Sequence, residues 1–242
     1  MSNKPLCVDL YCGLGGWASG FLAEGYQVIG FDVERHVYGE HRYPTQLVLQ
    51  DVLTLHGSRF KSAALIVASP PCQAYSYRAM PWKRAKALPP PDNALFEACF
   101  RIQREASEAA GHHIPMVVEN VCGAQKWVGR ARWHYGSYYL WGDVPALMPI
   151  ARCGVSAIKN SGGSWFNVAH NTGSGKGRNP DGRRTDGIKQ GGTWFHDTRG
   201  GSRSTSSKSL KRKAASAMIA KIPIDLARHI ARCWAPAAGD EA

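Results

Sequence analysis

Short apolar runs alternate with amphipathic stretches through the first 125 residues of the chain. Five apolar runs predict strands, at residues 6–10, 28–31, 47–49, 65–68 and 116–118. Three stretches between them predict helices, at residues 17–24, 35–43 and 93–110. Strands that alternate with helices are typical of a parallel sheet covered on both faces. The pattern therefore predicts a doubly wound, Rossmann-like α/β domain over residues 1–150.

The pattern changes beyond this region. Residues 133–148 predict further strands, with Trp133, Tyr135, Ser137 and Tyr139 on alternate positions. Residues 151–213 are rich in Gly, Ser, Asn and Arg, and predict a short irregular segment. Residues 214–242 predict a return to the first domain, through a helix that Ile222-Pro223 opens and in which Leu226, Ile230 and Cys233 share one face.

The segment 151–213 also carries most of the positive charge. It holds 13 Lys and Arg residues against three Asp, within a chain of net charge +12. Its Trp165-Phe166 and Trp194-Phe195 pairs each follow Gly-Gly-Ser or Gly-Gly-Thr, 29 residues apart. Such a segment indicates contact with a polyanion, foremost nucleic acid. A solubilising tail, or a miniature core anchored by the aromatic pairs, remains the alternative.

The lengths of the apolar runs and the spacing of the cysteines argue against several classes of protein. No apolar run approaches the roughly 20 residues of a membrane helix, and the seven cysteines include no Cys-x-x-Cys pair. This argues against a disulfide framework and against a zinc site. We expect a cytoplasmic, metal-free protein with reduced thiols, acting as a monomer.

The strongest chemical signal is Ser69-Pro70-Pro71-Cys72-Gln73, which follows a buried strand. A Pro-Pro step restricts the backbone, so the Cys72 thiol is held on a stiff loop at the carboxyl end of that strand. Open α/β sheets bind ligands at these ends. A buried structural cysteine is the alternative.

A second signal is the glycine-rich turn of residues 9–16, Asp-Leu-Tyr-Cys-Gly-Leu-Gly-Gly. Glycines let a ligand approach the backbone, and the following helix offers unpaired N–H groups. Asp9, Asp32 and Asp51 stand at three successive strand ends, where carboxylates can hold the polar groups of an adenosine-like cofactor. Each of them can also be an ordinary cap or turn residue.

Together these motifs resemble the cytosine-C5 DNA methyltransferase family. The resemblance covers residues 6–145 and about 214–234, and its most specific part is the pair Pro70-Pro71-Cys72 and Glu119-Asn120-Val121. The other matching motifs are residues 9–16 with Phe21, Phe31-Asp32, Gln50-Asp51-Val52, Arg130-Ala131-Arg132, and Ile222-Pro223 with Leu226-Ala227. The chain departs from the family at Val128, where a glutamine is usual, and at Ile219-Ala220, which replace Gly-Asn. Its small size fits a phage-type member.

The resemblance implies an S-adenosylmethionine-dependent enzyme, with S-adenosylhomocysteine as product, that methylates C5 of cytosine in double-stranded DNA. Cys72 would add to C6 of a flipped-out base while the Glu119 carboxyl group protonates N3. The implied catalytic residues are Cys72, Glu119, Arg130 and Arg132. The implied cofactor-binding residues are Asp9, Tyr11, Gly13, Leu14, Gly16, Asp32, Val33, Asp51, Val52 and Pro70. The implied nucleic-acid-binding residues are Gln73, Ser76, Trp165, Arg183, Arg184 and Trp194. An RNA cytosine-C5 methyltransferase, or a catalytically weakened relative that only binds nucleic acid, remains the alternative.

Overall fold

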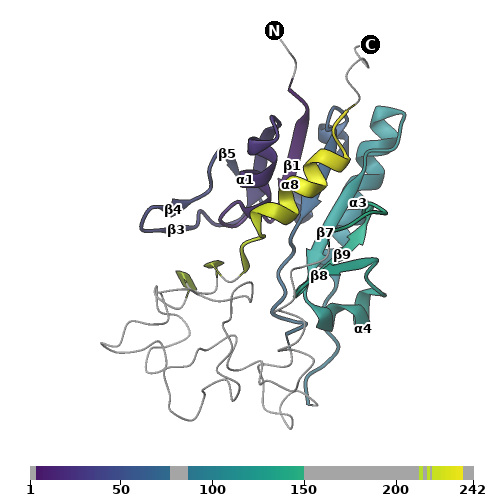
Figure 1. The fold of residues 1–242 in the computed structure, drawn as a ribbon. Helices are drawn as coiled ribbons and strands as arrows, with labels where there is room; N and C mark the ends of the chain where they lie inside the picture. Colours follow the sequence, from purple (N-terminus) through teal and green to yellow (C-terminus); the bar gives the residue numbers. More distant parts are fainter. Residues whose placement is uncertain (1–3, 77–86, 150–212, 215–216, 219, 237–242) are drawn as a thin grey trace.

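A computed structural model describes residues 4–76, 87–149, 213–214, 217–218 and 220–236 (Figure 1). Its strands are β1 (Leu6–Leu10), β2 (Gln27–Asp32), β3 (Val37–Tyr38), β4 (His41–Arg42), β5 (Gln46–Leu49), β6 (Leu65–Ala68), β7 (Met116–Asn120), β8 (Trp133–Tyr135) and β9 (Tyr138–Gly142). Its α-helices are α1 (Gly16–Ala23), α3 (Ala94–Ala110), α4 (Gln125–Val128) and α8 (Ile224–Cys233). Three short 3-10 helices are η1 (Val52–Thr54), η2 (Gly57–Phe60) and η4 (Cys122–Ala124).

Seven strands form one mainly parallel sheet in the order β5-β2-β1-β6-β7-β9-β8. In this sheet β9 pairs antiparallel with both of its neighbours, β7 and β8, and the other four strand pairs are parallel. The direction of strand succession reverses between β1 and β6, which therefore mark the topological switch point. The carboxyl ends of β1, β2, β6 and β7 share the lower edge of the sheet in Figure 1.

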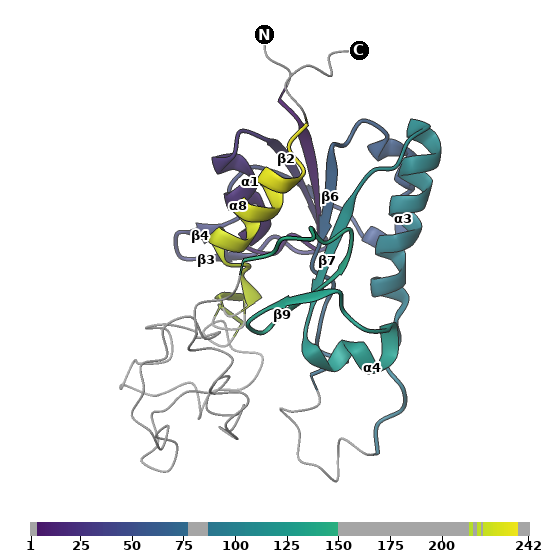
Figure 2. The same cartoon turned by 45° about the vertical axis from the view of Figure 1, so that its right-hand side comes forward.

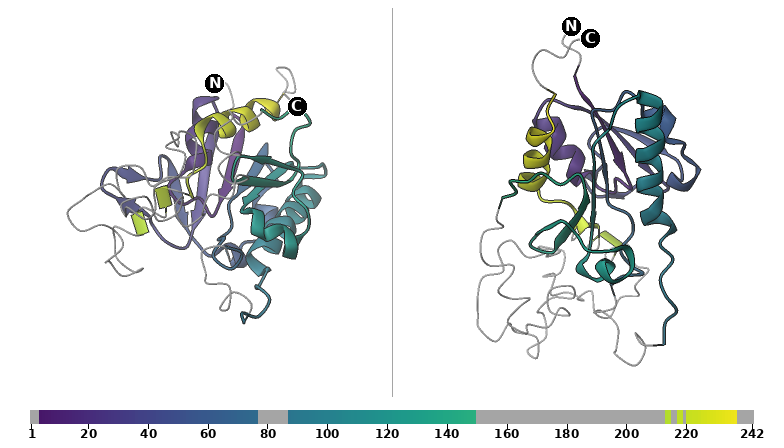
Figure 3. Two further views of the ribbon diagram at one scale, coloured as in Figure 1. Left: turned by 60° about the horizontal axis from the view of Figure 1, so that its bottom comes forward. Right: turned by 90° about the vertical axis from the view of Figure 1, so that its right-hand side faces the viewer.

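Helices cover both faces of the sheet (Figures 2 and 3). Val67 and Val117 face a core that contains Trp17 of α1 and Leu226 of α8. Alternate strand residues, such as Ile66 and Val118, face a second core that contains Ile102 of α3. Burial on both sides explains why the central strands are almost continuously apolar. Among the described residues, no helix has both the length and the apolar content to cross a membrane.

The predicted α/β fold with a parallel sheet is confirmed, and the five strands predicted in the first 125 residues are all present. The helix predicted at 35–43 is wrong, because β3 and β4 form a small hairpin there with Gly39 at φ 61° in its turn. A helix needs a continuous buried face, but residues 37 and 39–42 are exposed and only Tyr43 is fully buried.

The strands predicted in residues 133–148 end earlier than expected and are divided by a turn. Gly136, at φ 59°, and Ser137 separate β8 from β9, and regular pairing stops at Gly142. The further strands predicted here are therefore present as β8 and β9, but a turn interrupts the predicted alternation between Tyr135 and Tyr139. In α8, Leu226 and Ile230 are fully buried as predicted, whereas Cys233 is exposed.

Candidate active site

Four segments from different strands meet at the carboxyl edge beside the switch point. They are the turn after β1, Asp32 at the end of β2, the Cys72 loop after β6, and Glu119-Asn120 at the end of β7. The backbone N–H of Ser69 donates to the carbonyl of Leu10 at 3.1 Å, which ties the first and third of these segments together. This crevice is where an open α/β sheet binds its ligands.

The turn after β1 depends on left-handed backbone conformations. Tyr11 and Gly13 have φ 57° and 51°, and Gly15 has φ 70°. A Cβ atom added at Gly15 would collide with Pro44, and one at Gly16 would collide with the backbone of Ile222. A Cβ atom at Gly13 would meet no described atom within 4 Å. Gly15 and Gly16 are therefore needed for packing, while Gly13 borders open space.

Asp32 is an ionised acceptor at this turn. Its Oδ2 accepts the N–H of Gly13 at 2.9 Å, its Oδ1 accepts the N–H of Glu34 at 3.2 Å, and Nε2 of His36 lies 3.7 Å from Oδ1. Burial acts to raise the pKa of Asp32, but the interactions with His36, Gly13 and Glu34 outweigh it and lower the pKa. The next residue, Val33, is 69% exposed and offers an apolar surface beside the carboxylate.

Asp9 differs from its expected place at a strand end. It lies inside β1, is fully buried, and accepts a hydrogen bond at 3.2 Å from the hydroxyl of Tyr43. Burial raises the pKa of Asp9 well above its usual range, and the nearby Asp32 raises it further, although Tyr43 and the N–H of Ala18 act in the opposite sense. Its contacts with the hairpin segment and the first turn of α1 support a structural role.

Asp51 also uses its carboxylate locally. It is exposed beyond β5 and caps η1 by accepting the N–H of Leu53 at 2.9 Å, while Val52 is buried beside it. Both residues remain on the same edge as Asp32, since β5 pairs in parallel with β2.

Hydrogen bonds hold the described part of the Cys72 loop, residues 69–76, at both of its ends. At its start, Nε1 of Trp17 donates to the hydroxyl of Ser69 at 3.0 Å. At its end, the carbonyl of Cys72 accepts the N–H of Tyr75 at 3.0 Å and the hydroxyl of Ser76 at 2.9 Å. Pro70 is buried, Cys72 is half-buried and Gln73 is exposed. The loop thus places the Cys72 side chain at the protein surface on a fixed backbone.

The end of β7 is joined directly to this loop. Nδ2 of Asn120 donates to the carbonyl of Pro70 at 2.9 Å, and its Oδ1 accepts the N–H of Val121 at 2.8 Å. Because Asn120 is almost fully buried, these bonds are costly to lose. They hold the strand that carries the buried Glu119 against the loop that carries Cys72.

A second connection reaches the start of α3. The hydroxyl of Tyr75 donates to Oδ1 of Asn93 at 2.9 Å, and Nδ2 of Asn93 donates to the carbonyl of Trp127 at 3.4 Å. The hydroxyl of Tyr11 donates to the carbonyl of Leu95 at 2.8 Å. Both the glycine turn and the Cys72 loop are therefore anchored to the first turn of α3.

The two candidate catalytic arginines lie on the turn that leads into β8. The side chains of Arg130 and Arg132 are exposed, and Ala131 between them packs against the core. Two bonds to β9 fix this turn: Nε1 of Trp141 donates to the carbonyl of Gly129 at 2.9 Å, and the N–H of Arg132 donates to the carbonyl of Leu140 at 2.8 Å.

The structure thus brings the glycine turn, Asp32, Cys72 and Glu119 to one edge. The predicted nucleic-acid contacts Trp165, Arg183, Arg184 and Trp194 lie outside the described residues. Sequence reasoning gave no role to the residues that hold the site together, namely Tyr75, Asn93, Asn120 and Gln125. The described residues contain no cluster of three or more His, Cys, Asp or Glu side chains suited to a metal ion.

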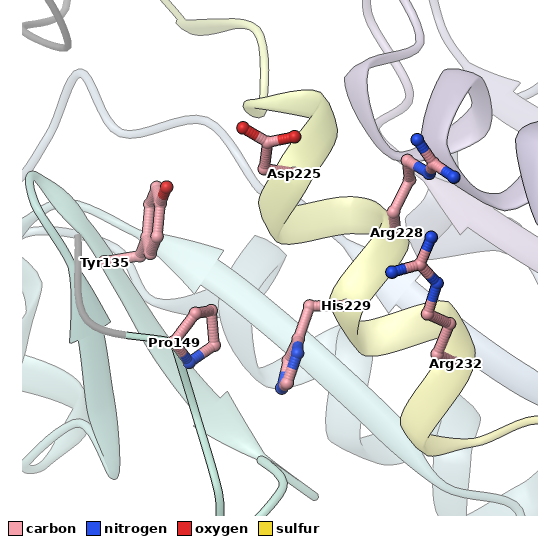
Figure 4. A pocket seen from close by; sticks show the side chains of 6 residues that line it. All are labelled: Tyr135, Pro149, Asp225, Arg228, His229 and Arg232. Atoms are coloured by element: carbon pink, nitrogen blue, oxygen red, sulfur yellow. The ribbon is translucent and has the colours of Figure 1, made fainter. Parts of the chain in front are cut away.

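A pocket of about 200 Å³ lies between α8 and the segment beyond β9 (Figure 4). Its Arg228 and Arg232 could suggest an anion site, but both already bind Glu24, at 2.6 and 2.8 Å. These bonds lower the pKa of Glu24 to about 2, and the bond from Arg232 has the largest effect. With Asp225 also in the lining, the arginine charges are balanced. We therefore assign the chemistry to the carboxyl edge of the sheet.

Residues 6–125 match the family model for the C-5 cytosine-specific DNA methylase. Among solved structures, the chain is similar to an Escherichia coli protein described as a prophage-encoded DNA modification methyltransferase, with 22% identity over 52% of this chain and 34% of that one, at a TM-score of 0.36. It is similar to the Dnmt2 methyltransferase of S. pombe, with 17% identity over 51% and 36% of the two chains, at a TM-score of 0.36. It is also similar to the Entamoeba histolytica methyltransferase EhMeth, with 14% identity over 66% and 60%, at a TM-score of 0.41. The chain thus spans about a third of the first two proteins, and no curated protein sequence matches it.

Proposed function

The chain belongs, through residues 6–125, to the C-5 cytosine-specific DNA methylase family, and from that premise we propose that it methylates C5 of cytosine in double-stranded DNA with S-adenosylmethionine as donor. The observation that carries the proposal is the bond from Asn120 to the carbonyl of Pro70. It supports a shared site for Cys72 and Glu119, which are 47 positions apart in the sequence.

The glycine turn fits such a cofactor. Open space at Gly13, the ionised carboxylate of Asp32 and the exposed side chain of Val33 suit the polar and apolar parts of a nucleoside. We propose that the cofactor is held by Tyr11, Gly13, Leu14, Gly16, Asp32, Val33, Asp51, Val52 and Pro70. When bound, S-adenosylmethionine supplies an electrophilic methyl group to C5 of the base.

Cys72 and Glu119 would activate a base that is too weak a nucleophile at C5. The Cys72 thiolate forms a bond to C6, and the electrons of the C5–C6 double bond move into the ring while the Glu119 carboxyl group donates a proton to N3. After C5 has been methylated, loss of its proton to a base returns an electron pair to the ring. The C6–S bond then breaks and releases the Cys72 thiolate, and N3 returns its proton to the Glu119 carboxylate.

Nucleic-acid binding is proposed for the surfaces beside this site. A thiolate adds to C6 from above or below the ring, where stacked neighbouring bases block its approach, so the cytosine must leave the duplex stack. Arg130 and Arg132 would contact a phosphate or the base, and Gln73 and Ser76 would line the loop. We propose that 1–150 is the catalytic unit, that 151–213 contacts DNA through Trp165, Arg183, Arg184 and Trp194, and that 214–242 completes the cofactor side.

The test uses duplex DNA in which 5-fluorocytosine replaces cytosine, because fluorine at C5 cannot leave as a proton. With S-adenosylmethionine present, we expect wild type and Cys233→Ala to form a denaturation-resistant adduct, and Cys72→Ala to form none. Methylation of ordinary DNA and of RNA by the same proteins is measured in parallel. Methylation of RNA alone would reassign the substrate, and turnover by Cys72→Ala would contradict the mechanism.

A further inference from the structure

The short helix α4 (Gln125–Val128) lies between two parts of the proposed active site. On one side, the carbonyl of Trp127 accepts the Nδ2–H of Asn93, which also binds Tyr75 of the Cys72 loop. Just before α4, in η4, Gly123 lies close to the carbonyl oxygen of Tyr75. A Cβ atom at Gly123 would collide with that oxygen. The amino-terminal part of this segment is therefore packed directly against the Cys72 loop.

On its other side, the same helix reaches the arginine turn. Oε1 of Gln125 accepts the N–H of Ala131 at 3.2 Å. Nε2 of Gln125 lies 3.4 Å from the carbonyl of Cys122, so the side-chain amide is oriented with its oxygen toward Ala131. A continuous set of contacts thus runs from the Cys72 loop through α4 to the peptide between Arg130 and Arg132.

We infer that Gln125 is a positioning residue that fixes Arg130 and Arg132 relative to the Cys72 loop. The bonds from Trp141 and Arg132 connect this turn to β9. Among the hydrogen bonds of the described residues, the bond from the N–H of Ala131 to Gln125 alone connects Ala131 to α4. Val128, where the family resemblance leads us to expect a glutamine, is apolar and packs against the core. Gln125 lies one helical turn earlier and supplies the amide oxygen.

This inference rests on the proposed function for its consequence in catalysis, but its structural part can be measured separately. Gln125→Met keeps the length of the side chain and removes the acceptor, whereas Gln125→Glu keeps an acceptor oxygen. Gln103→Leu is the control, because it removes two side-chain bonds near the opposite end of β7, to the carbonyl of Ile114 and to Oδ2 of Asp143. Each variant is studied in the full chain.

The first measurement is hydrogen exchange of the Ala131 amide, which needs no substrate. We expect Gln125→Met to exchange this proton about fivefold or more faster than wild type, as for loss of one hydrogen bond. Gln125→Glu and Gln103→Leu should leave its rate within about twofold. Equal rates in wild type and Gln125→Met would overturn the inference, whatever the protein does to DNA.

The second measurement is methyl transfer to DNA under steady-state conditions. We expect Gln125→Met to lower kcat/KM for DNA about fivefold, with the calorimetric affinity for S-adenosylmethionine unchanged and with most of the loss recovered in Gln125→Glu. If both variants lose the same activity, or if the loss follows only the folded fraction measured by thermal unfolding, the acceptor oxygen does not position the arginines. No methylation by wild type would contradict the proposed function instead, and the exchange measurement would still decide the role of Gln125.

Discussion

The two halves of the carboxyl edge are stabilised in different ways. In the β1–β2 half, the Asp32 carboxylate binds Glu34 and His36 of its own turn and Gly13, 19 positions away. In the β6–β7 half, the bonds join residues far apart, such as Asn120 with Pro70. The Asp32 bonds require β1 to pair with β2, whereas the Asn120 bond requires β6 to pair with β7.

Because of this difference, we expect substitutions in the two halves to impair different properties of the protein. The Asp32 bonds at the glycine turn involve no residue of the Cys72 loop, although the N–H of Ser69 ties that loop to Leu10 of β1. Long-range bonds such as that from Trp17 to Ser69 set the loop with reference to α1 and the sheet. We therefore expect changes in the first half to alter cofactor affinity, and changes in the second half to alter turnover with little effect on that affinity.

The largest effect is expected from Glu119→Gln in the β6–β7 half. This change keeps the size of the buried side chain and removes a group that can donate a proton to N3, so we expect kcat to fall by about 10² to 10⁴. The variant should bind S-adenosylmethionine as wild type does in calorimetry. A fall in cofactor affinity equal to the fall in kcat would show that the two halves are not separable.

A smaller effect in the opposite half is expected from Asp32→Ala. It removes a carboxylate that we propose for hydrogen bonds to ribose hydroxyls, and loss of a hydrogen bond to a charged group costs about 2 kcal/mol, or roughly a factor of 30 in affinity. The dissociation constant for S-adenosylmethionine is measured by calorimetry. Asp51→Ala tests the second carboxylate that we propose for the cofactor at this edge, and it also removes the cap of η1. Unchanged affinity in Asp32→Ala would reject its proposed role in binding.

Features that depend on local patterns could be predicted from the sequence. The apolar runs that became β1 and β6 are buried on both faces, which leaves a strong signal in the sequence. The resemblance to the methyltransferase family is confirmed for residues 6–125, which match the model of the C-5 cytosine-specific DNA methylase family. The roles of individual site residues stay predictions.

Features that depend on distant partners could not be predicted in the same way. Residues 35–43 have helix-compatible composition, and only the packing of Tyr43 against Gly30 and Asp9 shows why the chain forms a hairpin there. Asn120 belongs to a motif that the sequence shows, but its hydrogen bond to Pro70 could not be predicted, because Pro70 is 50 positions away. No local pattern marks Gln125, since its bond to Ala131 arises from the turn that follows α4.

The smallest effect is expected from the pH dependence of the β1–β2 half. The bond to Asp32 raises the pKa of His36, burial and Lys213 oppose this, and Glu34 adds to it. A histidine whose pKa is raised on folding contributes stability that is fully present below its unfolded pKa of about 6.5 and is lost as the pH rises through the folded pKa.

We therefore expect His36→Ala to lower the free energy of unfolding by less than about 1 kcal/mol at pH 6, because the pair is partly exposed. The difference from wild type should shrink as the pH rises above about 6.5 through the raised pKa. Denaturant unfolding between pH 5.5 and about 8.5 measures it. In an Asp32→Asn background the same substitution should show little pH dependence, since the partner charge is gone. A difference that grows with rising pH, or that persists unchanged in that background, would mean that the glycine turn is not held by this local pair.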